Sequence, residues 1–157
     1  MVTLFESDIL ATSADVLVAP VNKAGVAGAG LAKALADRYP DWRESYHGWC
    51  RSGCKDEGIF YQTSQGLTIY NGVTKISPYD NSTIVLVYMT VEGLAADAEI
   101  HRWATVAVPA LGCGLGGLDS STVIPYLCWR LWDHKTMFHV YLPPKRNRNT
   151  RVSMNKL

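Results

Sequence analysis

Residues 16–30 read VLVAPVNKAGVAGAG, and residues 106–117 read VAVPALGCGLGG. Each stretch begins with a run of apolar residues, which is typical of a strand buried on both faces of a sheet, and then becomes rich in glycine. Signals for a helix follow in both cases. We expect these helices from Gly28 to about Arg38 and from Asp119 or Ser120 to about Asp133. The two stretches therefore predict two strand–loop–helix units.

Further strands and helices alternate along the rest of the chain. Short apolar or β-branched runs predict strands at Val2–Phe5, Ile59–Gln62, Leu67–Asn71, Thr105–Pro109 and Met137–Leu142. A helix is expected from Trp42 to about Cys50, because Asp41 is a good N-cap. This order of elements predicts an α/β fold with a parallel or mixed sheet, in which ligands bind at the carboxyl ends of the strands.

The segment after Lys75 is ambiguous. Ser77 and Pro78 are typical of the start of a helix. The segment from Asn81 to about Ile100 is strand-like in its first part and helical in its second part. We expect one long helix there, because a crossover element is needed before the next parallel strand.

Length and composition indicate one compact domain. The chain has 157 residues, of which 48% are hydrophobic and 18% are charged, so disorder is excluded for most of it. The longest apolar runs, Val16–Val21 and Ile84–Met89, are too short to span a bilayer. No basic segment precedes an apolar stretch at the N-terminus, so no signal peptide is expected. We therefore expect a cytoplasmic protein without a membrane partner.

The net charge of +1 conceals an uneven distribution. Residues 1–133 carry nine Lys and Arg against fourteen Asp and Glu, whereas residues 134–157 carry six basic residues and no acidic one. The basic tail at 144–157 has two interpretations. It is either a solvated chain end or a segment that contacts the phosphates of a nucleic acid.

The two glycine-rich loops predict a site for a phosphorylated ligand. Glycine allows a ligand to approach the main chain closely, and consecutive N–H groups form a concave site for anions beside a helix N-terminus. Neither loop matches the P-loop pattern GxxxxGK[ST] or the dinucleotide pattern GxGxxG. One such loop alone is equally consistent with a tight turn. Two loops in matching contexts favour a clamp for a diphosphate.

Four blocks of sequence give the chain a resemblance to a known family. They are Ser7–Leu10, Asp15–Ala32, Thr74-Lys75 and Val108–Asp119. With these blocks the chain resembles the macrodomains, and among them the antitoxin-type DNA ADP-ribosyl glycohydrolases of the DarG kind. The resemblance covers about residues 1–143 and leaves the tail 144–157 unmatched. It implies a three-layer α/β/α sandwich around a mixed sheet.

The resemblance also implies where ADP-ribose binds. The Asp8 carboxylate would accept a hydrogen bond from the adenine amino group, with Ile9 beside it. The two loops would hold the diphosphate and the distal ribose, and the Asn22 amide would lie near that ribose. The implied ligand-binding residues are Asp8, Ile9, Asn22, Gly25, Ala27, Gly28, Gly30, Leu31, Pro109, Leu111, Gly112, Cys113, Gly114, Leu115 and Gly116.

Lys75 and Asn22 are the implied catalytic residues. Lys75 falls where the DarG-type lysine acts on the anomeric carbon, and desolvation beside a bound ribose would lower its pKa and make the neutral amine accessible. The chain departs from its relatives at three places, one of which is Lys23, where a small or thiol residue is expected. Gly116 stands where a related branch has an aspartate, and Asp119 is expected to cap a helix instead. After Lys75 the chain reads ISPYD, where the DarG-type pattern has basic and aromatic residues.

Two clusters near the first loop have structural and functional interpretations. The aromatic residues Trp42, Tyr46 and Trp49 recur at helical spacing. They either pack into the core or form a surface on which bases stack, and the core interpretation is favoured. His47, Cys50 and Cys54 have the spacing of metal ligands but lack a fourth ligand, so buried thiols are favoured over zinc. We expect neither a metal nor a cofactor.

Three functions fit the sequence. The first is hydrolysis of the N-glycosyl bond between ADP-ribose and an acceptor such as a nucleic-acid base. The second is a binding module for ADP-ribose without turnover, and the third is a phosphatase acting on ADP-ribose 1″-phosphate. Compactness and divergence outside the loops favour an origin in a phage or other mobile element.

Overall fold

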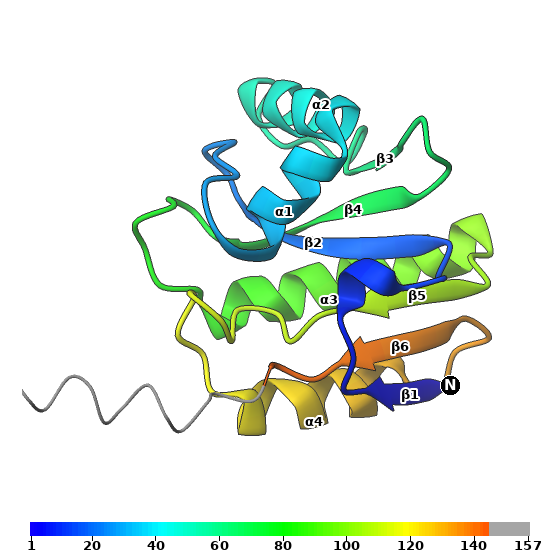
Figure 1. Cartoon of the computed structure of the whole chain (residues 1–157). Coiled ribbons are helices and arrows are strands. Elements are labelled where there is room, and N and C mark those ends of the chain that lie inside the picture. The colour runs from blue at the N-terminus through cyan, green and yellow to red at the C-terminus, as the bar shows by residue number, and fades with distance from the viewer. Residues whose placement is uncertain (145–157) are drawn as a thin grey trace, which may run out of the picture.

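The computed structural model describes residues 1–144 and shows a six-stranded mixed sheet (Figure 1). The strands lie in the order β1–β6–β5–β2–β4–β3, and all neighbours are parallel except β3 and β4. The strands are β1 (Val2–Phe5), β2 (Val16–Asn22), β3 (Phe60–Gln62), β4 (Thr68–Lys75), β5 (Thr105–Val108) and β6 (Met137–Tyr141). The helices are the short 3-10 helix η1 (Ile9–Ala11), α1 (Gly30–Arg38), α2 (Pro40–Arg51), α3 (Ile84–His101) and α4 (Ser120–Leu131).

Helices cover both faces of the sheet, as the alternation of side chains along β2 shows. Val16 and Val18 belong to a buried cluster with residues of α3 and α4. Leu17, Ala19 and Val21 belong to a second buried cluster with residues of α1 and α2, which lie together at the top of Figure 1. Because successive side chains of a strand point to opposite faces, β2 contributes to both cores. The predicted three-layer α/β/α sandwich is confirmed.

The aromatic residues of α2 belong to the core. Trp42 and Tyr46 are fully buried and their rings stack, with centroids 5.4 Å apart. Trp49 is also buried. The indole N–H of Trp42 donates a hydrogen bond to the side-chain oxygen of Asn71 in β4, at 3.0 Å. The favoured interpretation of these residues as core is confirmed.

The segment around Lys75 differs from its prediction. Strand β4 continues to Lys75 instead of ending at Asn71, and Ser77–Pro78 starts no helix. The long helix α3 begins at Ile84, where the Thr83 side chain accepts a hydrogen bond from the backbone N–H of Leu86. The expected single helix after residue 81 is thus present, but the start signal at Ser77 belongs to a turn.

The predicted domain of residues 1–143 lies within the described part of the chain. The basic tail falls almost wholly at 145–157 and lies outside the described residues. None of the helices within residues 1–144 combines the length and the apolar character needed to cross a bilayer.

Candidate functional site

A cavity of about 890 Å³ opens where four parallel strands end. Asn22 of β2, Lys75 of β4 and Tyr141 of β6 line it, and so does Pro109 directly after β5. The carboxyl ends of parallel strands meet at one edge of the sheet, which is where α/β folds bind ligands. The volume is within the range of small-molecule sites.

Asn22 shapes the first glycine-rich loop from a buried position at the end of β2. Its side-chain oxygen accepts hydrogen bonds from the backbone N–H groups of Ala24, at 3.0 Å, and Val26, at 3.3 Å. Its amide nitrogen donates to the carbonyl of Val26, at 2.8 Å. The Tyr46 hydroxyl contacts the same side-chain oxygen, at 3.2 Å. The Asn22 side chain therefore holds the chain reversal that leads into α1.

The first loop leaves a run of backbone N–H groups open at the cavity. Ala29 provides no side-chain cap for α1, so the first N–H groups of that helix lack the usual partner. Within residues 1–144, no hydrogen bond is donated by the N–H groups of residues 28–32, all of which line the cavity. Open amides at a helix N-terminus favour a bound anion.

The second loop presents a matching run. The N–H groups of Gly114, Leu115 and Gly116 donate no hydrogen bond to any group within the described residues, and all three residues line the cavity. The loop itself is closed by other amides, since the N–H of Leu118 donates to the Gly112 carbonyl at 2.9 Å. Gly112 has a φ of +75°, a conformation that glycine adopts without strain.

Ser82 fixes the second loop to the end of β4. Its N–H donates to the Gly116 carbonyl at 2.9 Å, and its hydroxyl donates to the Thr74 hydroxyl at 3.3 Å. A Cβ atom added at Gly116 would overlap the Ser82 hydroxyl oxygen and would lie 2.6 Å from the Gly112 carbonyl oxygen. The packing therefore excludes an aspartate at position 116 unless both Ser82 and the backbone at Gly112 move.

Lys75 and Asn22 are register partners across the β2–β4 ladder. The register shifts between Val21 and Asn22, so that Val21 pairs with Val73 and Asn22 pairs with Lys75. The Lys75 ammonium donates to the Pro78 carbonyl at 3.3 Å. Among the cavity residues within 1–144, Lys75 is the one with a basic side chain, whereas Glu6, Asp8 and Asp80 are acidic.

Asp8 lies on the cavity wall at the start of η1. One of its carboxylate oxygens accepts a hydrogen bond from the N–H of Leu10, at 2.9 Å, and thereby caps this short helix. The neighbouring Ile9 is half-buried and lines the same wall. Both residues are thus at the cavity, as an adenine contact requires.

The structure brings most of the sequence-predicted residues to the cavity and leaves four away from its wall. The Gly25 backbone lies against α2, where an added Cβ would be 3.3 Å from the Cys50 Cβ. Ala27 packs on the core beneath α1, and Leu111 is fully buried in the opposite core. Cys113 packs beside that core, and burial raises the pKa of its thiol to about 11. The predicted residues that line the cavity are Asp8, Ile9, Asn22, Gly28, Gly30, Leu31, Lys75, Pro109, Gly112, Gly114, Leu115 and Gly116.

Other wall residues were not predicted from the sequence. Ten of them come from the end of β2, the loop after β4 and the segment after β6: Pro20, Val21, Pro78, Tyr79, Asp80, Asn81, Ser82, Leu142, Pro143 and Pro144. The loop after β4 could not be predicted, because Ser77 and Pro78 are typical of the start of a helix. The segment after β6 reaches the cavity because β6 is parallel to β5, which no local pattern reveals.

The cysteine and histidine residues of α2 lie behind the first loop. The Cys50 thiol contacts the Asn22 carbonyl, with the sulfur 3.7 Å from the oxygen, and burial raises its pKa to about 12. His47 Nδ1 lies 3.5 Å from the Gly25 carbonyl oxygen. The sequence favours buried thiols over zinc ligands here. In the structure Cys50 and Cys54 are both partly buried, which agrees with that interpretation. In the part of the chain that is described, no three His, Cys, Asp or Glu side chains are grouped so as to hold a metal ion.

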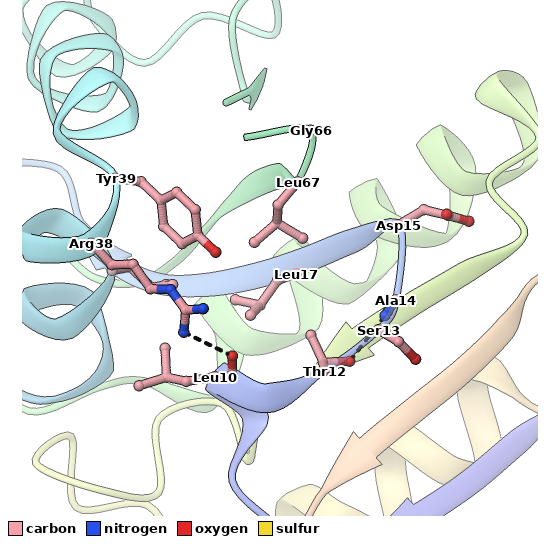
Figure 2. A pocket seen from close by; sticks show the side chains of 11 residues that line it. Leu10, Thr12, Ser13, Ala14, Asp15, Leu17, Arg38, Tyr39, Gly66 and Leu67 are labelled. Carbon is pink, nitrogen blue, oxygen red and sulfur yellow. Dashed lines mark hydrogen bonds between the residues drawn. The ribbon is translucent and has the colours of Figure 1, made fainter. Parts of the chain in front are cut away.

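A second, smaller cavity of about 260 Å³ lies near the start of β2 (Figure 2). Arg38 crosses it, and its guanidinium donates a hydrogen bond to the Leu10 carbonyl at 3.2 Å. Thr12 bonds to the backbone of Ala14 in the same wall, at 3.2 Å. The predicted ligand-binding residues line the larger cavity and not this one, so the larger cavity is the candidate site.

The Macro domain family profile matches residues 18–127, which include both glycine-rich loops and Lys75. The chain belongs to the macrodomain family. This macrodomain is 32% identical over 124 residues to a DNA ADP-ribosyl glycohydrolase of Mycobacterium tuberculosis, an alignment that covers 76% of the chain and 35% of the relative. In the alignment with a second curated relative, the chain covers 42% of that relative. The chain therefore spans less than half the length of each of these two curated relatives.

Solved structures of DarG proteins have the same fold as this macrodomain. The macrodomain of Mycobacterium tuberculosis DarG superposes with a TM-score of 0.84 at 31% identity, over 92% of this chain and 99% of that chain. Thermosipho africanus DarTG, solved in complex with ADP-ribose, superposes with a TM-score of 0.84 at 27% identity, over 96% of this chain and 44% of that chain. The sequence resemblance to DarG-type macrodomains is thereby confirmed.

Proposed function

We propose that this macrodomain binds ADP-ribose and hydrolyses the N-glycosyl bond that joins it to a nucleic-acid base. The observation that carries the proposal is the arrangement at the sheet edge. Two runs of open backbone amides, at residues 28–32 and 114–116, line one cavity with the register partners Asn22 and Lys75. The similarity to DNA ADP-ribosyl glycohydrolases and to a DarTG bound to ADP-ribose supports it.

The open amides suit the diphosphate. A diphosphate carries two negative charges, and the cavity contains one basic side chain within the described residues, that of Lys75. Backbone N–H groups and the N-terminus of α1 supply the positive potential that the diphosphate needs. This division leaves the lysine free to act elsewhere on the ligand.

Asp8 and Ile9 suit the adenosine end. One carboxylate oxygen of Asp8 is used by Leu10, and the second can accept a hydrogen bond from the adenine amino group. Ile9 provides an apolar contact for the base. The predicted contacts of Gly25, Ala27, Leu111 and Cys113 are indirect, because these residues support the two loops from behind.

Lys75 suits the reacting end of the ligand. The neutral amine attacks the anomeric carbon of the distal ribose as the bond from that carbon to the base nitrogen breaks. The electron pair leaves with the base, which takes up the proton that the attacking lysine nitrogen loses. Water then adds to the anomeric carbon as its bond to the lysine nitrogen breaks, which releases ADP-ribose and restores the amine. Asn22, next to Lys75 in the ladder, positions the loop that borders this ribose.

The decisive experiment measures release of ADP-ribose from an ADP-ribosylated single-stranded oligonucleotide by the wild type and by Lys75→Ala. We expect the variant to be slower by a factor of about 100 or more, the usual effect of losing a group that acts on the reacting atoms. Lys23→Ala is the matched control, because Lys23 is an exposed lysine outside the cavity wall, and it should act like the wild type. Equal release by wild type and Lys75→Ala would overturn the role of Lys75.

A second candidate function is a binding module without turnover, and the crowding at Gly116 favours it. The related branch with an aspartate in this loop uses two groups, whereas here the space is filled by Ser82. Calorimetric binding of ADP-ribose without release from any conjugate would select this function. Release of phosphate from ADP-ribose 1″-phosphate with an intact glycosidic bond would instead identify a phosphatase.

The cytoplasmic location and the mobile-element origin stay predictions.

A further inference from the structure

The loop of residues 76–82, between β4 and α3, presents one aromatic side chain at the cavity. Tyr79 lines the cavity and is 96% exposed, the highest value among the exposed large hydrophobic residues of the described chain. A tyrosine whose ring contacts almost no protein contributes little to the fold, although the ring has a large apolar face. An exposed aromatic ring on the wall of a ligand site is typical of a residue that contacts the ligand.

The loop holds Tyr79 in a defined place. The N–H of Asp80 donates to the Ser77 carbonyl at 3.1 Å, and the N–H of Tyr79 donates to the Ser77 hydroxyl at 3.3 Å. The N–H of Ser77 donates to the Asp80 carboxylate at 3.3 Å, which closes the turn. On the side of β2, the N–H of Lys23 donates to the Ile76 carbonyl at 3.1 Å. Tyr79 therefore projects from a cross-bonded turn.

The turn is bonded directly to Lys75. The Lys75 ammonium donates to the carbonyl of Pro78, the residue that precedes Tyr79. When the amine reaches the anomeric carbon, the group attached to that carbon is the acceptor of the ADP-ribose. The acceptor thus emerges beside the turn that carries Tyr79.

We propose that the ring of Tyr79 stacks on the nucleobase to which ADP-ribose is attached, and so determines specificity for nucleic-acid conjugates. This inference rests on the proposed function. A base has a flat uncharged face that matches a phenol ring, and stacking tolerates any base. The exposed side chain of Leu115 adds an apolar surface to the same cavity.

The test compares Tyr79→Ala with the wild type on an ADP-ribosylated single-stranded oligonucleotide. We expect KM to rise about 5- to 150-fold, the range that removal of one base–aromatic stack produces, with a smaller change in kcat. Tyr79→Phe keeps the ring and should restore KM. Tyr88→Ala removes another exposed tyrosine, outside the cavity wall, and should match the wild type.

Binding measurements separate this inference from the proposed hydrolysis. Two proteins are compared, the Lys75→Ala variant and the Lys75→Ala, Tyr79→Ala double variant. Their affinity for free ADP-ribose is measured by calorimetry, and their affinity for the ADP-ribosylated oligonucleotide is measured by fluorescence anisotropy. We expect Tyr79→Ala to weaken only oligonucleotide binding, by a similar factor, even if the wild type proves unable to cleave.

Three results would overturn the role of Tyr79. The first is that the Tyr79→Ala protein binds the ADP-ribosylated oligonucleotide as tightly as before. The second is that its affinity for free ADP-ribose falls as much as its affinity for the oligonucleotide. The third is that its affinity for an ADP-ribosylated peptide falls by the same factor as its affinity for the oligonucleotide. The last result would show that the ring contacts the ADP-ribose or any acceptor, without preference for a base.

Discussion

At the scale of single residues, Ser82 connects two parts of the site that are distant in sequence. Its N–H donates to the Gly116 carbonyl and its hydroxyl donates to the Thr74 hydroxyl, so it bonds the second loop to the end of β4. The sequence does not reveal this serine, because its partners lie 8 and 34 positions away and no local motif joins them. The glycine-rich loops could be predicted because their signal is local.

A substitution at Gly116 tests the connection that Ser82 makes between the second loop and the end of β4. Gly116→Ala should lower the free energy of unfolding by about 1–3 kcal/mol, the usual cost of forcing extra atoms into a packed place, and should weaken ADP-ribose binding. Gly114→Ala is the matched control for stability, since an added Cβ there meets no atom within 4 Å. Urea unfolding of both variants provides the comparison. A Gly116→Ala protein as stable as Gly114→Ala would show that Ser82 and the Gly112 backbone both shift freely.

Asn22 should be more important for the loop than for direct contact with the ligand. Asn22→Ala removes three bonds to the backbone of residues 24–26 and should cost on the order of 2–3 kcal/mol of unfolding free energy. Asn81→Ala, which alters an exposed asparagine, should cost much less. Hydrogen exchange of the amides of Ala24 and Val26 is the specific readout. Unchanged protection of these amides in Asn22→Ala would contradict the proposed role.

At the scale of elements, β4 shows why its length could not be predicted. Asn71 and Gly72 interrupt the apolar pattern and suggest the end of a strand. In the structure, Asn71 accepts the Trp42 indole N–H, and a Cβ at Gly72 would lie 2.8 Å from the Val18 Cγ1. Both residues are thus explained by neighbours in other elements. The strand extends to Lys75 because pairing with β2 outweighs the weak local preference of these residues.

The start of α3 provides a prediction for an element. Thr83→Ala removes the side-chain acceptor for the N–H of Leu86 and should lower the free energy of unfolding by about 1 kcal/mol, the usual value for an N-cap. Thr83→Ser retains the hydroxyl and should lose at most a small part of that amount. Thermal unfolding of the two variants decides the point, and an equal loss in both would show that the Thr83 methyl matters instead of the cap.

At the scale of the whole molecule, the alternation of apolar strands and helices predicts an α/β fold, and the resemblance to the macrodomains implies its three layers. The apolar run Val16–Val21 has small or branched side chains on both faces, which is what a central strand between two helical layers requires. The relative order of the strands is a different matter. It brings the segment after β6 to the cavity, and it depends on packing between segments that are far apart in sequence.

Stability should decrease at alkaline pH. Burial raises the pKa of the Cys50 thiol to about 12 and that of Cys113 to about 11, whereas an unfolded thiol loses its proton near pH 8.5–9. The unfolded state therefore releases protons first, and the free energy of unfolding falls as the pH rises from about 9 towards 11–12. Urea unfolding at pH 8 and pH 10 measures the effect. Cys50→Ala should reduce the slope, and a stability that does not fall between these pH values would contradict the prediction.

The basic tail leads to a prediction about nucleic-acid binding by the whole chain. Deletion of residues 144–157 removes five Lys and Arg residues. Binding to an unmodified single-stranded oligonucleotide should weaken. The logarithmic slope of its salt dependence should become shallower by about 0.7 for each phosphate that the tail neutralises in the full chain. Fluorescence anisotropy over a range of salt concentrations tests this, and an unchanged slope would indicate a solvated chain end without a role in binding.

The position of Lys75 inside the β2–β4 ladder has a consequence for how such a site can change. The lysine is held by strand pairing, whereas Tyr79 lies four residues further along, on a surface turn. The amine itself is bonded to the Pro78 carbonyl, so the side chains of residues 79–81 can differ without displacing it as long as this carbonyl keeps its place. Under the proposed function, reaction chemistry and choice of acceptor would then be separable traits, and substituting the side chains of residues 79–81 would be a direct way to change which conjugates this macrodomain accepts.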